Sequence, residues 1–278
     1  MHRAPDDRPI IGPVAAPDLH CMTLNVRRRV PRPVGHPDAW EARRAAVVTL
    51  VASEQPTVLA VQEALPDQVS DLASGLGSRW EPVVVGRGAR GGGEASGVFV
   101  DTDRCTVVER RSWALSRRPR RAGSRSWATA FPRNVAGAVL DDRATGRRFL
   151  ALGTHLDVVS PWARYRSAQL VARIVAESGL PAVVMADCNC PAGSAPWRAL
   201  AEAGLPDTWG RASRPGTPEL GTYAAYREPR ADRARIDAVF ATEGAVVSRV
   251  AVSSRRPDGV WPSDHLPVHA VLSFGADA

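Results

Sequence analysis

The sequence contains no lysine, so arginine supplies all 36 of its basic residues. Arginine stays charged at physiological pH, and its planar donor group matches phosphate oxygens, so this composition is compatible with an anionic partner. A bias in codon supply explains the missing lysines more simply, and 29 acidic residues leave a net charge of only +7. The absence of lysine therefore does not by itself identify a partner.

Cysteines are few, and long apolar stretches are missing. Four cysteines in 278 residues are too few for a disulfide framework, and the spacing of Cys188 and Cys190 matches no standard zinc pattern. No apolar run approaches the roughly 18 to 20 residues that span a bilayer. Residues 1–17 carry acids and prolines where a secretory signal would be apolar. We therefore expect a cytoplasmic protein with reduced thiols and no membrane span.

The pattern that is present is typical of an α/β protein. Hydrophobic residues make up 44% of the chain and charged residues 23%, which excludes a disordered or fibrous protein. Short apolar, strand-like runs alternate with helical stretches, of which one begins after the Asp38 capping signal and another runs from Ser160-Pro161 to Gly179. We expect an N-terminal extension, residues 1–18, followed by a single domain over residues 19–275.

Polar residues stand at the ends of these apolar runs. Asn25, Glu63, His155 and Asp187 each follow a run, Asp237 lies inside one, and Asp264 and His265 precede the last. The ends of strands are rigid and the adjoining loops are accessible, so α/β folds tend to assemble their sites there. Each residue taken alone is more typical of a turn or a cap, and only the set indicates a site.

Carboxylates, amides and histidines together suit the hydrolysis of a phosphate ester. The reaction needs neutralised phosphoryl oxygens, an activated water and a stabilised leaving oxygen. Mg²⁺ prefers oxygen ligands, which Glu63 and Asn25 offer. Asp187 and Asn189 are two residues apart, so on an extended strand end they share one face. In that position Asp187 can accept a proton from water while Asn189 orients the water or the phosphate.

Six short motifs occur in order along residues 19–273: Thr23-Leu24-Asn25-Val26-Arg27, Val61-Gln62-Glu63, Thr154-His155-Leu156-Asp157, Met185-Ala186-Asp187-Cys188-Asn189, Arg235-Ile236-Asp237 and Ser263-Asp264-His265-Leu266-Pro267-Val268. This series resembles the endonuclease/exonuclease/phosphatase superfamily of Mg²⁺-dependent hydrolases, and in particular a bacterial branch with THLD, RID and SDH elements. The resemblance implies a DNase I-like α/β fold, a four-layer sandwich of two mixed β-sheets flanked by helices.

The same resemblance implies a metal site. Glu63 would be the principal ligand of Mg²⁺, with Mn²⁺ as a possible substitute. Asn25 would assist it, and Asp264 would bind the ion directly or through water. Apurinic endonucleases carry an acid at the position of Arg27 and a tyrosine at that of His155, so the resemblance does not extend to that branch.

Catalytic and substrate-binding roles are implied in the same way. The residues expected to act in catalysis are His155, Asp187, Asn189, Asp237 and His265, with His155 donating to the scissile phosphate or the leaving oxygen and Asp237 orienting His265. Arg133, which matches an arginine common in this branch, would contact phosphate. Asp157 is assigned to the substrate site as a neighbour that orients His155, and its role is the least defined.

One segment accounts for the excess of positive charge. Residues 110–140 contain eight arginines and no acid, and since the whole chain carries +7, the rest sums to −1. The segment also holds Trp113, Trp127 and Phe131, and interleaved cations and aromatics suit a surface that binds nucleic acid. A solvated loop with core aromatics explains the pattern equally well. No protein partner is predicted.

Three functions remain open from the sequence. The first is a Mg²⁺-dependent phosphodiesterase acting on nucleic acid. The second is a phosphatase or phosphodiesterase of small or lipid-linked phosphate esters, such as inositol phosphates or sphingomyelin, with the same catalytic residues. The third, a non-catalytic binding protein, is disfavoured because a non-enzyme has no need for Glu63, Asp187 and His265 together.

Overall fold

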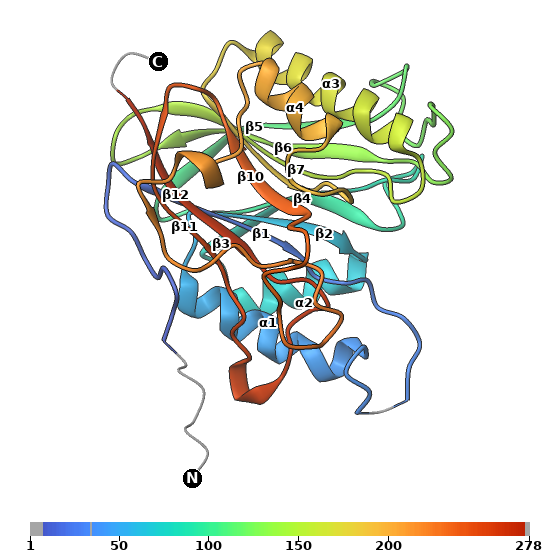
Figure 1. Ribbon diagram of the computed structural model, residues 1–278, viewed down its shortest axis with the longest axis vertical. Helices are drawn as coiled ribbons and strands as arrows, with labels where there is room; N and C mark the ends of the chain where they lie inside the picture. Colours follow the sequence, from blue (N-terminus) through green and yellow to red (C-terminus); the bar gives the residue numbers. More distant parts are fainter. Residues whose placement is uncertain (1–7, 34, 276–278) are drawn as a thin grey trace.

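The computed structural model describes residues 8–33 and 35–275, and it shows four layers (Figure 1). One sheet has the strand order β3 (Trp80–Gly86), β4 (Ala95–Asp101), β2 (Val58–Ala64), β1 (Leu19–Asn25), β12 (Val268–Phe274), β11 (Ala245–Val252) and β9 (Arg214–Pro215). The other has the order β10 (Asp237–Ala241), β8 (Ala182–Asp187), β7 (Arg148–His155), β6 (Asn134–Asp142) and β5 (Cys105–Ala114).

Helices cover the outer faces of both sheets. Helices α1 (Trp40–Glu54) and α2 (Pro66–Leu76) lie below the seven-stranded sheet in Figure 1, and α3 (Pro161–Ser178) and α4 (Ala195–Glu202) lie above the five-stranded sheet. Both sheets contain parallel and antiparallel pairs, such as β1 with β2 and β1 with β12. The expected four-layer sandwich of two mixed sheets is confirmed.

The central strands divide their side chains between two cores. On β1, Cys21 packs between the sheets while Met22 packs against α1 and α2. On β8, Met185 packs between the sheets while Ala186 packs against α3 and α4. A strand has a period of two, so every second residue enters the inter-sheet core. These strands are buried on both faces and therefore read as continuous apolar runs.

Four of the predicted site residues continue this inter-sheet row. Asn25, His155 and Asp187 end β1, β7 and β8, and Asp237 begins β10, which pairs with β8 so that Asp237 lies opposite Asp187. Each is an even number of residues from a neighbour in the inter-sheet core. The polar residues therefore gather at one end of the gap between the sheets.

Capping of the two predicted helices differs. Ser160 caps α3 by accepting a hydrogen bond from the amide of Ala163, and Gly179 ends the helix with a φ of 65°. The predicted capping box at Asp38 is wrong: Ala39 is the cap of α1 and makes no side-chain bond. The Asp38 carboxylate is instead bound by Arg27, Arg32 and the hydroxyl of Tyr226.

A second polar cluster lies at the start of β1. The imidazoles of His20 and His269 share a hydrogen bond of 2.9 Å between Nε2 and Nδ1, and both residues are fully buried. Nearby, the Glu54 carboxylate accepts the amides of Ile10, Ile11 and Gly12. The cluster thus ties part of the expected N-terminal extension to the sheet, whereas residues 1–7 of that extension lie outside the described residues. No helix within the described ranges is long and apolar enough to cross a membrane.

The close approach of the sheets can be tested at Gly153 on β7. A Cβ atom at this position would lie 2.3 Å from the carbonyl oxygen of Gly97 on β4. Because the sheets would have to separate, Gly153→Ala should lower the free energy of unfolding by about 1–3 kcal/mol in urea denaturation. Gly210→Ala, whose Cβ meets nothing within 4 Å, is the control and should change it by less than about 0.5 kcal/mol. Equal effects of the two substitutions on the free energy of unfolding would contradict the close approach of β7 and β4 at Gly153.

The buried histidine pair predicts a loss of stability in acid. Burial lowers the pKa of His20 to about 3 and that of His269 to about 4, from 6.5 in the unfolded chain. The unfolded state therefore binds more protons below pH 6.5, and the pair's contribution is complete above that pH and falls toward pH 4 and 3. The free energy of unfolding should drop more steeply with acidification in wild type than in His20→Gln/His269→Gln. Parallel curves would contradict this.

Candidate functional site

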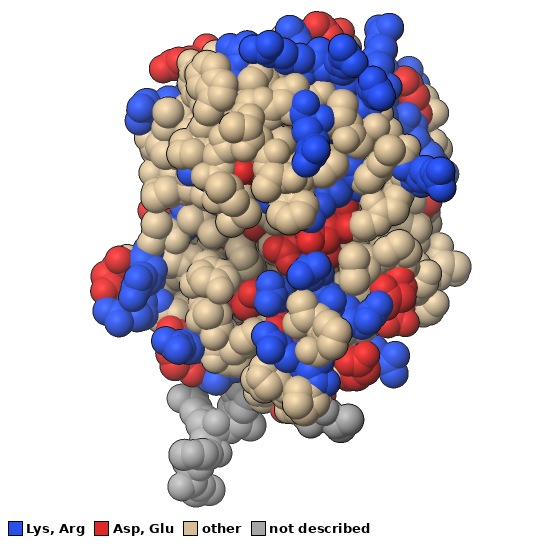
Figure 2. Space-filling view, turned by 90° about the vertical axis from the view of Figure 1, so that its right-hand side faces the viewer, with Lys and Arg blue, Asp and Glu red and all other residues tan. Residues whose placement is uncertain are grey.

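A pocket of about 500 Å³ opens where the polar strand ends meet. Figure 2 shows it as a hollow with acidic residues at its bottom and basic residues around it. The lining residues are Arg27, Arg28, Glu63, Arg87, Glu94, Phe131, Arg133, His155, Val158, Asp187, Asn189, Tyr223, Ile236, Asp264 and His265. Seven of the predicted site residues are among them. The other three, Asn25, Asp157 and Asp237, each contact a lining residue.

Asn25 joins the two halves of the site. Its amide nitrogen donates to Glu63 over 3.1 Å and to Asp187 over 2.9 Å, so it links a carboxylate of one sheet to a carboxylate of the other. Its amide oxygen accepts the backbone N–H of Arg27. In this arrangement Asn25 fixes the positions of the two carboxylates.

Glu63 reaches the pocket through a β-bulge. Along β2, Val58 and Ala60 face the other sheet while Leu59 and Val61 face the helices, so simple alternation would turn Glu63 toward the helices. The pairing of β2 with β4 is irregular between Val61 and Ala64, and Glu63 has a φ of 62°. This left-handed conformation is uncommon outside glycine, and it turns the carboxylate toward the pocket.

Asn189 is also placed by a left-handed residue, and the expectation of an extended strand end is wrong. β8 ends at Asp187, and Asn189 has a φ of 50°. The Asn189 backbone N–H donates to the Asp187 carboxylate over 3.0 Å, which closes the turn. The Asn189 amide nitrogen then donates to Nε2 of His155 over 2.7 Å. Asp187 and Asn189 thus both line the pocket, as expected, and Cys188 is buried in the core beneath α3.

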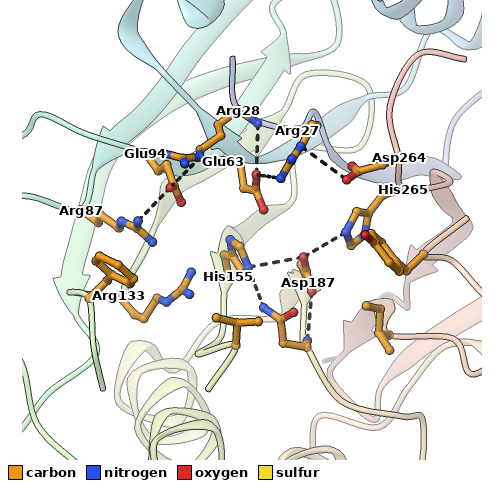
Figure 3. Close-up of a pocket in the computed structure, with 15 residues that line it drawn as sticks. Arg27, Arg28, Glu63, Arg87, Glu94, Arg133, His155, Asp187, Asp264 and His265 are labelled. Atoms are coloured by element: carbon orange, nitrogen blue, oxygen red, sulfur yellow. Dashed lines mark hydrogen bonds and ion pairs between the residues drawn. The ribbon is translucent and has the colours of Figure 1, made fainter. Parts of the chain in front are cut away.

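The two histidines of the pocket, which lie on either side of Asp187 (Figure 3), differ in charge. Burial and the charge of Arg133 lower the pKa of His155 to about 4, although Asp187 opposes them. Burial acts on His265 too, but the charges of Asp237 and Asp187 outweigh it and raise the pKa of His265 to about 10. His155 is therefore neutral and His265 cationic at pH 7. The cationic ring can donate from both of its nitrogens, whereas the neutral ring donates from one and accepts at the other.

His265 is oriented as the sequence predicts. Its Nδ1 lies 2.9 Å from Oδ2 of Asp237, and its Nε2 lies 3.9 Å from Oδ2 of Asp187. The same Asp187 oxygen is 3.5 Å from Nε2 of His155, so Asp187 lies between the two rings. A carboxylate bound to Nδ1 fixes which nitrogen faces the pocket.

Asp157 occupies a different position from the one expected. It accepts hydrogen bonds from the hydroxyl of Thr129 and from the amides of Val159 and Ser160. No hydrogen bond between Asp157 and His155 occurs within the described ranges, so Asp157 does not orient that ring here. Its second oxygen lies 3.5 Å from Nε of Arg133. Asp157 therefore holds the loop that carries Arg133.

Glu63 and Asp264 face a shared cation. Arg27 lies 4.0 Å from Glu63 and 3.5 Å from Asp264, so its guanidinium bridges the two carboxylates. Burial opposes ionisation of Glu63, but two other effects lower the pKa of this carboxyl to about 2: the positive charge that His155 acquires in acid and the hydrogen bond from Asn25. Two carboxylates that share one cation form a donor set that fits Mg²⁺, which takes oxygen ligands. Ligand atoms of Asp187, Asp237 and His265, all within 4.8 Å of one another, form a second candidate group.

Further pocket residues were not predicted from the sequence. Glu94 lies 2.9 Å from Arg87 and 3.7 Å from Arg28, and these three form one wall with Phe131. The glycine-rich stretch 86–93, which contains Arg87 and is followed directly by Glu94, is a sequence signal by which both residues could have been found. Tyr223 lies on the other wall, and nothing in the sequence distinguishes it from an ordinary loop residue.

The arginine-rich segment divides into three parts. Arg110 and Arg111 lie on β5 and pair with Glu81 and Glu109, both outside the segment. Arg133 lines the pocket. The connecting loop forms a hollow of about 480 Å³ of its own, lined by Ala89, Ser116, Arg117, Arg118, Arg121, Ala122, Gly123, Ser124, Arg125 and Ser126. Trp113 and Trp127 pack against the core, so only Phe131 is left as an exposed aromatic.

Comparison with known proteins agrees with this geometry. A model of the endonuclease/exonuclease/phosphatase family matches residues 22–265. A family member from Bacteroides vulgatus is 28% identical with a TM-score of 0.84, covering 93% of this chain and 99% of that one. The mannosyl-6-phosphatase of Bacteroides thetaiotaomicron is 26% identical with a TM-score of 0.83, covering 92% and 100%.

More distant structures share the fold. TDP2 of D. rerio, solved with a single-strand DNA product, is 16% identical with a TM-score of 0.70, covering 93% of this chain and 100% of that one. No curated protein sequence matches the chain. The family model spans most of the chain, including every strand end that lines the pocket, and the protein therefore belongs to the endonuclease/exonuclease/phosphatase family.

Proposed function

We propose that the protein is a Mg²⁺-dependent phosphodiesterase whose substrate is nucleic acid. The observation that carries the proposal is the buried guanidinium of Arg133, whose hydrogen bonds are incomplete within the described residues. This side chain is only 5% exposed and lines the pocket, and its Nε and Nη1 have no hydrogen-bond partner within the described residues. A buried arginine with open donors is costly unless an anion completes it. A phosphoryl group beside His155 would do so (Figure 3).

The acidic residues and Asn189 would bind the metal ion and activate the water. Glu63 and Asp264 would hold Mg²⁺ in the place that Arg27 neutralises here, and the ion would offset charge on the phosphoryl oxygens. Asp187 accepts the proton of the attacking water, and Asn189 keeps that water or the phosphate in position.

The protonated groups act on the phosphate. His265 is cationic at pH 7 and donates to a phosphoryl oxygen, while Asp237 fixes its orientation. Arg133 binds another oxygen. Neutral His155 accepts from Asn189 at Nε2 and so carries its proton on Nδ1, and this N–H donates to the phosphate or the leaving oxygen. The proposal thus gives a role to each of the seven predicted site residues that line the pocket.

Nucleic acid is favoured by the positive loop beside the pocket. Within the described part of the chain, Arg117, Arg118, Arg121 and Arg125 form no ion pair, and all four are exposed. Charges that are not neutralised by the protein remain available to a polyanion. A second candidate, hydrolysis of a sugar phosphate, is supported by the 26% identity to a mannosyl-6-phosphatase.

The catalytic proposal can be tested with Glu63→Gln. Wild type should hydrolyse a phosphodiester in the presence of Mg²⁺ or Mn²⁺, and EDTA should abolish the activity. Glu63→Gln removes a charged ligand and should lower kcat/KM at least about 100-fold. Glu177→Gln, an exposed change on α3, is the control and should behave as wild type. If wild type and Glu63→Gln are equally inactive on diesters, monoesters and sugar phosphates, the protein is a binding protein instead.

The salt dependence tests the substrate class. Hydrolysis of a single-stranded oligonucleotide should fall steeply between about 50 and 200 mM salt, because binding releases counterions. Removing two phosphate contacts with Arg118→Gln/Arg121→Gln should reduce the slope of log kcat/KM against log salt by about 1–2. Arg173→Gln/Arg214→Gln removes two exposed arginines on α3 and β9 and should leave the slope unchanged. Turnover of sugar phosphates without cleavage of any oligonucleotide would favour the second candidate.

A further inference from the structure

A second hollow borders the catalytic pocket. It has a volume of about 430 Å³ and shares Tyr223 and Ile236 with the pocket. Its remaining lining residues are Gly221, Ala224, Ala225, Arg227, Glu228, Pro229, Arg230, Arg233 and Ala234. Because two lining residues are common to both, a ligand that leaves the catalytic pocket past Tyr223 enters this hollow. We call it the 221–236 hollow.

Tyr223 forms the boundary between the pocket and the hollow. Its side chain is 55% exposed, and its ring lies 5.2 Å from the ring of His265. The backbones of these two residues also form an isolated β-bridge. An exposed aromatic ring fixed next to a catalytic group offers a flat apolar surface beside the reacting phosphate.

The segment that carries Tyr223 is held firmly to the catalytic loop. The amides of Ala224 and Ala225 both donate to the carbonyl oxygen of Asp264. Ala225 and Tyr226 have φ values of 51° and 62°, a conformation that non-glycine residues rarely adopt. The hydroxyl of Tyr226 donates to Asp38, which also binds Arg27. Strained backbone of this kind persists where the surroundings determine it, and it occurs often at ligand sites.

Two of the arginines that line the hollow are not neutralised by an acidic side chain of the described residues. Arg227 and Arg233 are exposed, and neither forms an ion pair within residues 8–33 and 35–275. The other charged groups there are already paired, Arg230 with Asp232 and Glu228 with Arg256. The hollow therefore combines an aromatic surface with two available guanidinium groups.

A second exposed aromatic ring lies on the opposite wall of the pocket. Phe131 is 53% exposed, and the guanidinium of Arg87 lies 5.1 Å from the centre of its ring. Figure 3 shows Arg87 and His265 on opposite sides of His155 and Asp187. Phe131 and Tyr223, which contact Arg87 and His265, thus flank the catalytic groups from two sides.

We propose that the 221–236 hollow is a nucleotide subsite, which binds the nucleotide next to the scissile phosphate of a single-stranded nucleic acid. The base stacks on Tyr223, and Arg227 and Arg233 contact the phosphate that follows. The other neighbouring base stacks on Phe131. The inference rests on the proposed phosphoester hydrolysis and adds the part of the substrate that the catalytic residues do not bind.

The chemistry of the hollow fits a single strand in particular. Alternating aromatic surfaces and cations match the alternating bases and phosphates of an unpaired strand, and every base offers a face for stacking. Bases in a duplex are stacked on each other and cannot reach both rings. A small phosphate monoester would occupy the pocket alone and leave Arg227 and Arg233 without a ligand.

The experiment compares a minimal substrate with a strand. Steady-state kcat/KM is measured for methyl p-nitrophenyl phosphate and for DNA oligonucleotides of two to six nucleotides, with Tyr223→Ala, Tyr223→Phe, Arg227→Gln/Arg233→Gln and the matched control Arg173→Gln/Arg214→Gln. Fluorescence anisotropy of a labelled thymidine hexanucleotide in the presence of EDTA measures binding without hydrolysis. This second measurement is independent of any loss of catalysis.

Wild type should gain kcat/KM as the oligonucleotide lengthens into the subsite. Tyr223→Ala should lower the ratio of kcat/KM for the hexanucleotide to that for the minimal diester by about 10-fold, and the double arginine variant should lower it similarly. Tyr223→Phe, which keeps the ring, and the matched control should preserve the ratio. Anisotropy should show the same order of affinities.

The experiment also distinguishes failure of the subsite from failure of the proposed hydrolysis. If the minimal diester is hydrolysed while all variants bind and cleave the hexanucleotide as wild type does, the subsite is wrong and the proposed hydrolysis stands. If wild type hydrolyses sugar phosphates alone and binds no oligonucleotide, the nucleotide subsite is likewise overturned. If no phosphate ester is hydrolysed but the hexanucleotide binds through Tyr223, the proposed function fails and the binding site stands.

Discussion

The site depends on the two-residue period of the strands that pack between the sheets. Because alternate residues of β1, β7, β8 and β10 fill the inter-sheet core, the polar residues that end or begin those strands must meet at its edge. The packed core fixes the backbones of these polar residues, and it excludes water from the side of the site that faces the core. The row of side chains between the sheets is apolar along the strands and becomes polar at the strand ends, with Asn25, His155, Asp187 and Asp237. The pocket lies at this change.

Burial of so many charged groups requires that they neutralise one another. Asp237 stabilises the positive charge of His265, and Arg27 bridges Glu63 and Asp264. Arg133 is satisfied least, since its Nε and Nη1 have no hydrogen-bond partner within the described residues and its one ion pair, with Asp157, spans 3.5 Å. The charges of the protein are thus nearly balanced inside the pocket, and the remaining positive charge is placed where a phosphate would lie.

Much of this could be predicted from the sequence because the strand ends are local features. The α/β pattern, the limits of α3 and the gathering of polar residues follow from short-range periodicity and from the ordered motifs. The turns at Glu63 and Asn189 could not, because each has a left-handed backbone that long-range packing imposes. Asp38 likewise has the sequence of a cap, but Arg27 and Tyr226, distant in the chain, bind it instead. The position of Tyr223 depends on its bridge to His265, for which no local pattern exists.

In the proposed mechanism, Glu63 and Asp264 form a divalent metal site at the edge of the inter-sheet core. Substoichiometric Mn²⁺ added during NMR spectroscopy of the histidine ring signals tests it most directly, since the paramagnetic ion broadens only nearby protons. The signals of His155 and His265 should be lost selectively, and Glu63→Gln/Asp264→Asn should abolish this loss. Broadening of His20 and His269 instead, whose cluster with Glu54 lies at the other end of β1, would contradict it. So would broadening that survives the double substitution.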